Sequence, residues 1–172
     1  MSEFLGKKVL ITGAAGGLGC RMATEIARQG GHVILWDIDV TRLEKVASEI
    51  SSLGAKESHY CCDLSQKEEI YRWAAQVQKD IGTPDIIINN AGIVYGKTFL
   101  ELTDEKIEKT FLVNTFAPLW LVKFFLPKMI ERKSGHIVNI SSAAGTIGVA
   151  GLADYCASKF ALFGFNESLR NE

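Results

Sequence analysis

The sequence lacks the features of a secreted, metal-binding or nucleic-acid-binding protein. Its four cysteines form no spaced framework and no secretory leader is present, which favours a reducing, intracellular and cytoplasmic setting. Its three histidines are scattered, so no metal site is expected. The net charge is −1, with Lys and Arg spread along the chain. This argues against nucleic acid or an anionic membrane as the main partner.

No linker, repeat or low-complexity segment divides residues 1–172, a length that fits one domain with a substantial core. Hydrophobic residues make up 47% and charged residues 23%, a balance typical of globular proteins. One apolar stretch, 111–130, is long enough to cross a membrane. It is interrupted by Asn114, Pro118, Lys123 and Pro127. We therefore expect a buried helix there and no membrane span.

Apolar, β-branched stretches alternate along the chain with stretches whose apolar residues have helical spacing. The stretches predicted as strands are 7–12, 32–37, 56–63, 84–90 and 135–142. The stretches predicted as helices are 18–31, 40–54, 65–82, 103–132 and 152–170. We expect Asp39 or Thr41 to cap the second helix, and Ser65 with Glu68 to open the third. The alternation predicts an α/β protein, a doubly wound parallel sheet (the Rossmann fold) with helices on both faces.

Four glycines fall within the eight residues Thr12–Gly19, "TGAAGGLG", between the first strand and the first helix. Backbone N–H groups at the start of a helix are unpaired and carry partial positive charge, so they attract phosphate. Glycines let the backbone turn tightly and approach a ligand without a Cβ clash. The pattern predicts a nucleotide-binding turn at Gly13, Gly17 and Gly19. A tight glycine turn without a ligand is the alternative.

Asp37 ends the second strand, 18 residues after Gly19. An acidic residue at this place accepts hydrogen bonds from the ribose hydroxyls of adenosine and repels a 2′-phosphate. We therefore expect NAD as the cofactor. NADP is disfavoured but stays open, because Arg21 and Arg42 lie nearby in sequence. The alternative for Asp37 is a loop carboxylate that caps the next helix.

Tyr155 and Lys159 lie four residues apart on the last predicted helix, so they share a face. An ammonium one turn from a phenol favours the phenolate, which makes the pair a candidate general acid–base for an alcohol or carbonyl. Ser141 and Ser142 end the fifth predicted strand, beside the nucleotide site in this architecture. A serine hydroxyl there can hold a substrate oxygen against the tyrosine, and polar capping of the strand end is the alternative.

Taken together, these motifs resemble the short-chain dehydrogenase/reductase family over the whole chain. "TGAAGGLG" matches its TGxxxGxG cofactor turn, "NNAG" at 89–92 matches the motif after its fourth strand, and "YCASK" matches YxxxK. Ser142 lies 13 residues before Tyr155, the usual spacing of the family. "VILWDID", "GKTF" and "GHIVNISSAAG" are most similar to the branch that handles retinoids, steroids and other lipophilic alcohols.

The resemblance implies an oxidoreductase that transfers a hydride between a nicotinamide cofactor and a small-molecule alcohol or ketone. Tyr155 would exchange the proton at the substrate oxygen, and Ser142 would orient that oxygen. Lys159 would favour the phenolate and bind the nicotinamide ribose, and Asn114 would help to hold a water molecule that carries the proton onward. The implied cofactor contacts are Gly13, Gly17, Leu18, Gly19, Asp37, Asp63, Asn90, Tyr155 and Lys159, with Asp63 at the adenine.

The resemblance also implies features around the domain. A full family member continues through two further strands and a substrate loop, so we expect a chain that ends at Glu172 to be part of a longer enzyme. A non-catalytic NAD-binding or oligomerisation module is the alternative. Family members commonly form homodimers or homotetramers through long helices, which the apolar Phe116–Phe124 stripe favours. Relatives in this branch often carry an N-terminal membrane anchor or associate with lipid-droplet surfaces, but Met1–Gly6 predict no anchor.

Overall fold

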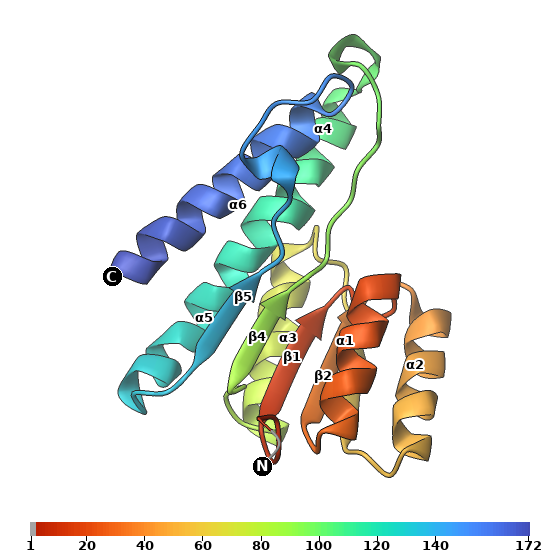
Figure 1. The fold of residues 1–172 in the computed structure, drawn as a ribbon, viewed down its shortest axis with the longest axis vertical. Helices are drawn as coiled ribbons and strands as arrows, with labels where there is room; N and C mark the ends of the chain where they lie inside the picture. Colours follow the sequence, from red (N-terminus) through yellow and green to blue (C-terminus); the bar gives the residue numbers. More distant parts are fainter. Residues whose placement is uncertain (1–2) are drawn as a thin grey trace.

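A parallel sheet forms the centre of the protein (Figure 1). The computed structural model describes residues 3–172, and within them the sheet has five strands in the order β3-β2-β1-β4-β5. The strands are β1 (Lys8–Thr12), β2 (His32–Asp37), β3 (Glu57–Cys61), β4 (Ile86–Asn89) and β5 (His136–Asn139). The strand order reverses at β1, since β2 pairs on one side of it and β4 on the other. This reversal creates a crevice at the carboxyl ends of β1 and β4.

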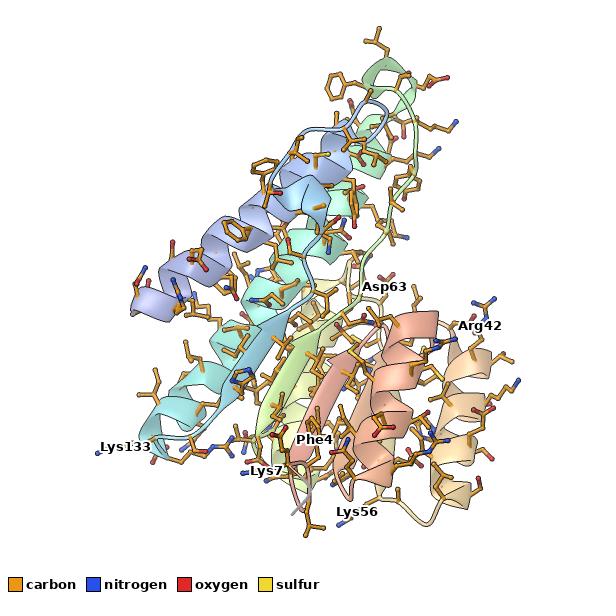
Figure 2. All side chains as sticks on the ribbon, viewed as in Figure 1. Phe4, Lys7, Arg42, Lys56, Asp63 and Lys133 are labelled. Atoms are coloured by element: carbon orange, nitrogen blue, oxygen red, sulfur yellow. The ribbon has the colours of Figure 1, made fainter. Side chains whose placement is uncertain are left out.

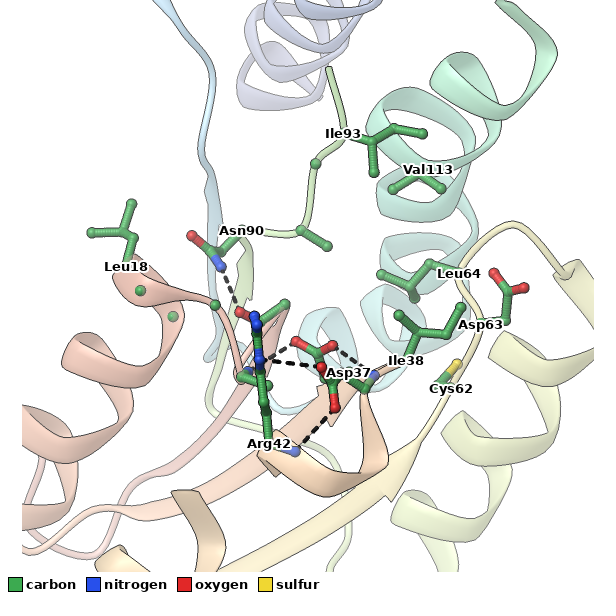
Figure 3. A pocket seen from close by; sticks show the side chains of 18 of the residues that line it. Leu18, Asp37, Ile38, Arg42, Cys62, Asp63, Leu64, Asn90, Ile93 and Val113 are labelled. Atoms are coloured by element: carbon green, nitrogen blue, oxygen red, sulfur yellow. Dashed lines mark hydrogen bonds and ion pairs between the residues drawn. The ribbon is translucent and has the colours of Figure 1, made fainter. Parts of the chain in front are cut away.

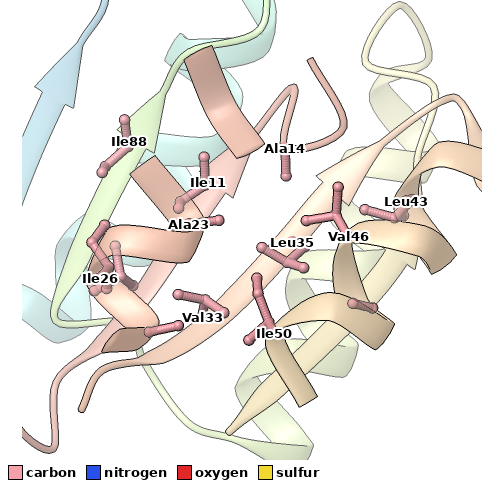
Figure 4. Close-up of a cluster of buried hydrophobic side chains, with 13 residues drawn as sticks. Ile11, Ala14, Ala23, Ile26, Val33, Leu35, Leu43, Val46, Ile50 and Ile88 are labelled. Atoms are coloured by element: carbon pink, nitrogen blue, oxygen red, sulfur yellow. The ribbon is translucent and has the colours of Figure 1, made fainter. Parts of the chain in front are cut away.

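Helices cover both faces of the sheet, which confirms the predicted α/β class. The helices are α1 (Gly17–Arg28), α2 (Val40–Ser52), α3 (Lys67–Asp80), α4 (Asp104–Phe111), α5 (Ala117–Glu131) and α6 (Ala153–Asn171). Val9 and Ile11 of β1 face α1 and α2 in one core (Figure 4). Leu10, between them, faces α3 and α5 in the other. Successive strand residues point to opposite faces, so both cores need apolar residues.

The predicted boundaries differ from the observed ones by at most three residues, and one predicted cap is wrong. Asp39 caps α2, since its carboxylate accepts the Arg42 N–H at 3.0 Å. Ser65 does not open α3, which begins at Lys67 after Gln66. The Ser65 hydroxyl instead donates to Asp63 at 2.7 Å, because that nearby carboxylate is the stronger acceptor. Accordingly the expected pairing with Glu68 is wrong too, and the Glu69 carboxylate accepts the Asp63 N–H instead.

The long helical region predicted over 103–132 is continuous but not uniform. A π-helical turn, Leu112–Phe116, joins α4 to α5. Pro118 follows in the first turn of α5 and has no N–H, so the carbonyl four residues earlier, that of Asn114, receives no ordinary α-helical bond. The stretch Asp104–Glu131 is long and apolar enough to cross a membrane, and half of its apolar window is buried inside the fold. Burial of this kind is typical of a core helix.

The last helix, α6, packs against α4 and the π-helical turn and runs out beside the edge strand β5 (Figure 1). A chain of amides joins the sheet to this helix. Asn89 of β4 donates to Asn139 of β5 at 2.8 Å, and Asn139 donates to Asn166 of α6 at 3.0 Å. The fifth strand ends at Asn139 and not at the predicted Ser142, so Ser141 and Ser142 lie in the loop between β5 and α6.

Candidate active site

A cavity of about 450 Å³ opens at the carboxyl end of the sheet, where the strand order reverses (Figure 3). Figure 2 shows Asp63 and Arg42 at this end, and Lys7 and Lys56 at the opposite end. Seven predicted cofactor contacts line the cavity: Gly13, Gly17, Leu18, Gly19, Asp37, Asp63 and Asn90. The other two, Tyr155 and Lys159, are not among its lining residues. The structure thus gathers the predicted adenosine side of the site in one hollow.

The glycines of the turn have different roles: two are needed for the fold, and one leaves open space in the cavity. Gly13 has a φ of +65°, and a Cβ there would lie 2.9 Å from the Ala91 Cα. A Cβ on Gly19 would overlap the Gly13 carbonyl oxygen. These two positions therefore need glycine for the fold itself. A Cβ on Gly17 would meet no described atom within 4 Å, yet Gly17 lines the cavity at the start of α1. That open cradle of backbone fits a phosphate group.

Asn90 holds the glycine turn in place. Its side-chain amide donates to the carbonyls of Thr12 at 2.9 Å and Gly13 at 3.2 Å. The Thr12 hydroxyl in return accepts the backbone N–H groups of Asn90 and Ala91, both at 3.1 Å. The residue after β4 is thus bonded to the residue that ends β1. Because both amide hydrogens are used within the protein, Asn90 shapes the cavity chiefly by fixing its glycine wall.

Asp37 lies at the carboxyl end of β2 and lines the cavity. One carboxylate oxygen accepts the Ala15 N–H at 2.9 Å, and the other accepts the Asp39 N–H at 3.0 Å. The alternative of a helix cap is wrong for Asp37, since Asp39 performs that function. A carboxylate offers about four acceptor positions, so Asp37 keeps acceptor capacity for hydroxyl groups of a ligand. Arg42 lines the cavity too, and its guanidinium is paired with Asp39 at 3.3 Å.

Asp63 lies across the cavity from Asp37, in the loop after β3 (Figure 3). One of its carboxylate oxygens accepts both the N–H and the hydroxyl of Ser65, at 2.9 and 2.7 Å. This fixes the loop and leaves the second carboxylate oxygen without a hydrogen bond to the described residues. Ile38, Leu64 and Val113 add apolar walls beside this carboxylate, and apolar walls with a few polar groups suit a purine ring.

Tyr155 and Lys159 lie one turn apart on α6, with the lysine ammonium 5.8 Å from the centre of the tyrosine ring. Lys159 is 3% exposed, and its ammonium donates to the Ile140 carbonyl at 2.8 Å. Within residues 3–172 it forms no ion pair. Burial lowers the pKa of Lys159, because the ammonium loses its water. The Tyr155 hydroxyl makes no hydrogen bond to the described residues, which leaves it available to a ligand. A buried, unpaired charge close to the ring of a tyrosine whose hydroxyl is free is typical of a functional site.

Ser142 lies in the loop that precedes α6. Its hydroxyl oxygen accepts the Ala144 N–H at 3.1 Å and so caps the short turn Ala143–Gly145. Ser142 therefore caps this turn and not the end of the strand, so the alternative of strand-end capping is wrong for Ser142. The hydroxyl proton has no acceptor among the described residues, and it remains free to bind a substrate oxygen. Capping and substrate binding use different sides of the same oxygen, so the two roles are compatible.

Asn114 lies fully buried in the π-helical turn. Its Oδ1 accepts the Ile93 N–H at 2.8 Å, and its Nδ2 donates to the Ile93 carbonyl at 2.9 Å. A Cβ on Gly92 would lie 3.5 Å from both the Asn114 Oδ1 and the Lys159 Nζ. Gly92 also lines the cavity. The two predicted halves of the site, nucleotide cavity and acid–base group, therefore meet at Gly92.

Several residues of the site escape prediction from the sequence. Ile93 and Ile140 act through backbone atoms, which have no side-chain signature. Lys109 and Cys62 line the cavity from elements whose position depends on the whole fold. Burial raises the pKa of Cys62 to about 12, so its thiol stays protonated. Residues 3–172 contain no group of three His, Cys, Asp or Glu side chains placed to hold a metal ion.

Comparison with known proteins identifies the family. The profile of the short chain dehydrogenase family matches residues 7–172. The chain belongs to this family. It is 54% identical over 165 residues to epidermal retinol dehydrogenase 2 of Homo sapiens, covering 95% of this chain and 53% of that protein. It is 44% identical over 167 residues to estradiol 17-beta-dehydrogenase 11 of Homo sapiens, covering 97% and 56%.

The chain spans about half the length of the curated relatives that it matches. Among solved structures, a metagenomic short-chain oxidoreductase in complex with NADP superposes with a TM-score of 0.92 at 36% identity, over 96% of this chain and 76% of that one. A xylitol dehydrogenase bound to NAD⁺ superposes with a TM-score of 0.91 at 28% identity, over 97% and 65%. The similar structures thus include one with each nicotinamide cofactor.

Proposed function

We propose that the chain forms the cofactor-binding and acid–base part of an oxidoreductase that interconverts an alcohol and a ketone or aldehyde. The observation that carries this proposal is the buried, unpaired ammonium of Lys159, 5.8 Å from the ring centre of Tyr155, whose hydroxyl is free, next to the glycine-walled cavity. The proposed domain is the single unit 1–172. The bound nicotinamide cofactor would accept or supply the hydride.

The proposed cofactor is NAD. The backbone at Gly17 and Leu18 faces the phosphates, Asp37 accepts the adenosine ribose hydroxyls, and Asp63 contacts the adenine. Support for NAD over NADP comes from the two charges at the end of β2. Asp37 lines the cavity, and Asp39 holds the guanidinium of Arg42 in an ion pair. A 2′-phosphate there would meet a fixed carboxylate and an already paired arginine.

The proposed proton chemistry uses four side chains. Tyr155 gives a proton to the substrate oxygen in reduction and takes it back in oxidation. The Lys159 ammonium favours the phenolate. It lies close to Gly92, which lines the cavity, and this position suits binding of the nicotinamide ribose. The free proton of Ser142 holds the substrate oxygen. Asn114 has its amide hydrogens occupied, so we assign water binding to its backbone carbonyl, which Pro118 leaves without an α-helical donor.

The proposed substrate is a lipophilic alcohol or ketone of the retinoid or steroid type. The names of the similar proteins support this class, since they are a retinol dehydrogenase and an estradiol dehydrogenase. We further propose a cytoplasmic homodimer or homotetramer. Exposed aromatic side chains support it: Phe116 at the end of the π-helical turn, stacked on Trp120 of α5 at 5.6 Å, and Phe160 and Phe163 on α6.

Fluorescence titration with NADH, and NADPH alongside, tests the cofactor, and a panel containing retinol and a hydroxysteroid tests turnover. Wild type and Tyr155→Phe should bind NADH equally, because the phenol lies outside the adenosine cavity. Turnover of the variant should fall by about a hundredfold or more, as expected for a lost general acid–base. Equal turnover in the two proteins would refute the assigned chemistry. NADH binding without wild-type turnover would indicate a non-catalytic module.

A further inference from the structure

Ser158 lies between the two acid–base residues of α6 and is fully buried. Its hydroxyl makes two hydrogen bonds. It donates to the backbone carbonyl of Tyr155 at 2.7 Å, and it is 3.1 Å from the Nδ2 of Asn114. One small side chain therefore touches the turn of the helix that carries Tyr155 and the polar centre of the π-helical turn.

The single hydroxyl proton decides the direction of these bonds. Because the proton of Ser158 points to the Tyr155 carbonyl, its oxygen can only accept from Asn114. This requires the NH₂ group of the Asn114 amide to face Ser158. The carbonyl oxygen of the same amide then faces the Ile93 N–H, at 2.8 Å. Ser158 thus supports the same orientation of the asparagine amide that the two backbone groups of Ile93 require.

The amide orientation matters for the cavity wall. In the observed orientation Asn114 binds both backbone groups of Ile93, which follows the cavity-lining Gly92. The reversed amide would place its NH₂ against the Ile93 N–H and its oxygen against the Ile93 carbonyl, with both bonds lost. The backbone at Gly92, which is close to the Lys159 ammonium, would lose its support.

We propose that Ser158 is a positioning residue, which orients Asn114 and thereby fixes the Gly92–Ile93 backbone between the cofactor cavity and Lys159. Its effect on the backbone depends only on the contacts described. Its effect on turnover rests on the proposed function, since it acts through Asn114, Lys159 and Tyr155. A purely structural role in helix packing is the competing explanation, and the chain supplies a control for it.

Thr115 provides this matched control. Its hydroxyl donates to the backbone carbonyl of Ser158 at 3.0 Å, and the residue is buried. Thr115→Val therefore removes a hydrogen bond between the same turn and the same residue of α6 without touching the asparagine amide. If Ser158 only holds the two helices together, Ser158→Ala and Thr115→Val should have similar consequences.

Amide hydrogen exchange at Ile93, followed by NMR, tests the positioning role and needs no turnover. Ser158→Ala should accelerate exchange at Ile93 by about five- to tenfold, the factor that corresponds to one hydrogen bond of ordinary strength. Thr115→Val should leave Ile93 at the wild-type rate. Ser158→Cys, which fills the site with a weaker acceptor, should give a smaller acceleration, and it serves if the alanine variant does not fold. Equal rates at Ile93 in wild type and both Ser158 variants, or equal acceleration in Thr115→Val, would overturn the proposal.

Kinetics add a second readout. Ser158→Ala should lower kcat and change the pH–rate profile while the KM for NADH stays near the wild-type value, and Thr115→Val should change neither. An unchanged profile in Ser158→Ala would contradict the catalytic consequence. If the wild-type chain binds no NADH, the proposed function fails on that measurement, and the Ile93 exchange rates still decide the role of Ser158.

Discussion

The carboxylate of Asp37 accepts the backbone N–H of Ala15 at 2.9 Å, across the gap between β2 and the glycine turn. This bond joins the two sequence features that predict a nucleotide site. It aligns the acidic side chain with the turn before any ligand is present, and it leaves acceptor positions of the carboxylate toward the cavity. The adenosine side of the proposed site is therefore preorganised by the protein itself.

Asp37→Ser should weaken NADH binding and strengthen NADPH binding. The serine offers the ribose hydroxyls one neutral oxygen in place of a charged carboxylate, and it removes the charge that repels a 2′-phosphate. We expect the ratio of the two dissociation constants to change by about tenfold or more, which corresponds to roughly 1.4 kcal/mol. Fluorescence titration with both cofactors measures the ratio. Glu44→Gln on α2 removes one exposed charge outside the cavity lining and should leave the ratio unchanged. The same shift in both variants would indicate a general charge effect.

Gly17 and Gly19 should respond differently to the same change. Gly19→Ala forces a methyl group onto the Gly13 carbonyl and should lower the free energy of unfolding by about 1–3 kcal/mol, as overpacking does. The methyl group of Gly17→Ala meets no described atom, so the free energy of unfolding in urea should be near the wild-type value. Its methyl group would occupy the phosphate cradle, and NADH affinity should fall by about tenfold or more. Wild-type NADH affinity in Gly17→Ala would show that this glycine is not required by a ligand.

The sequence predicts the features that depend on local pattern and on the shared edge of parallel strands. Asp37 and the glycine turn are found because strand ends converge in a doubly wound sheet. Ser65 is predicted wrongly. A serine between Asp63 and a helix can form a hydrogen bond with either, and here its hydroxyl donates to the Asp63 carboxylate. The tertiary contacts of Asn114 with Ile93 and Ser158 are not predictable in this way. They depend on how a π-helical turn and α6 pack, and two of the three partner atoms belong to the backbone.

Thr110 and Asp154 should contribute to the free energy of unfolding through the hydrogen bond between them. The Thr110 hydroxyl lies 2.7 Å from the Asp154 carboxylate, and both residues are buried between α4 and α6. Thr110→Val should cost about 1–3 kcal/mol in the free energy of unfolding, because it leaves a buried acceptor unsatisfied. The double variant Thr110→Val with Asp154→Leu should cost less than the sum of the two single changes. Additive costs in urea unfolding would show that the two groups do not interact.

His32 should make the protein less stable in mild acid. Burial lowers the pKa of His32 below its usual 6.5, and Lys56 and Lys8 add to this, against a smaller opposite effect of Glu57. The unfolded chain therefore binds a proton at a pH where the folded protein does not. As the pH falls through 6.5 toward the folded pKa, the free energy of unfolding decreases.

His32→Gln should remove part of this loss, measured as the difference in urea unfolding free energy between pH 7 and pH 5. Glutamine keeps a polar group near the Ser58 hydroxyl, which is 3.0 Å from the His32 ring. Lys56→Gln should also reduce the loss, because it removes a charge that disfavours the imidazolium. His136→Gln, at an exposed position at the start of β5, should lose as much stability as wild type. If His32→Gln loses as much stability as wild type between the two pH values, His32 does not titrate as its surroundings require.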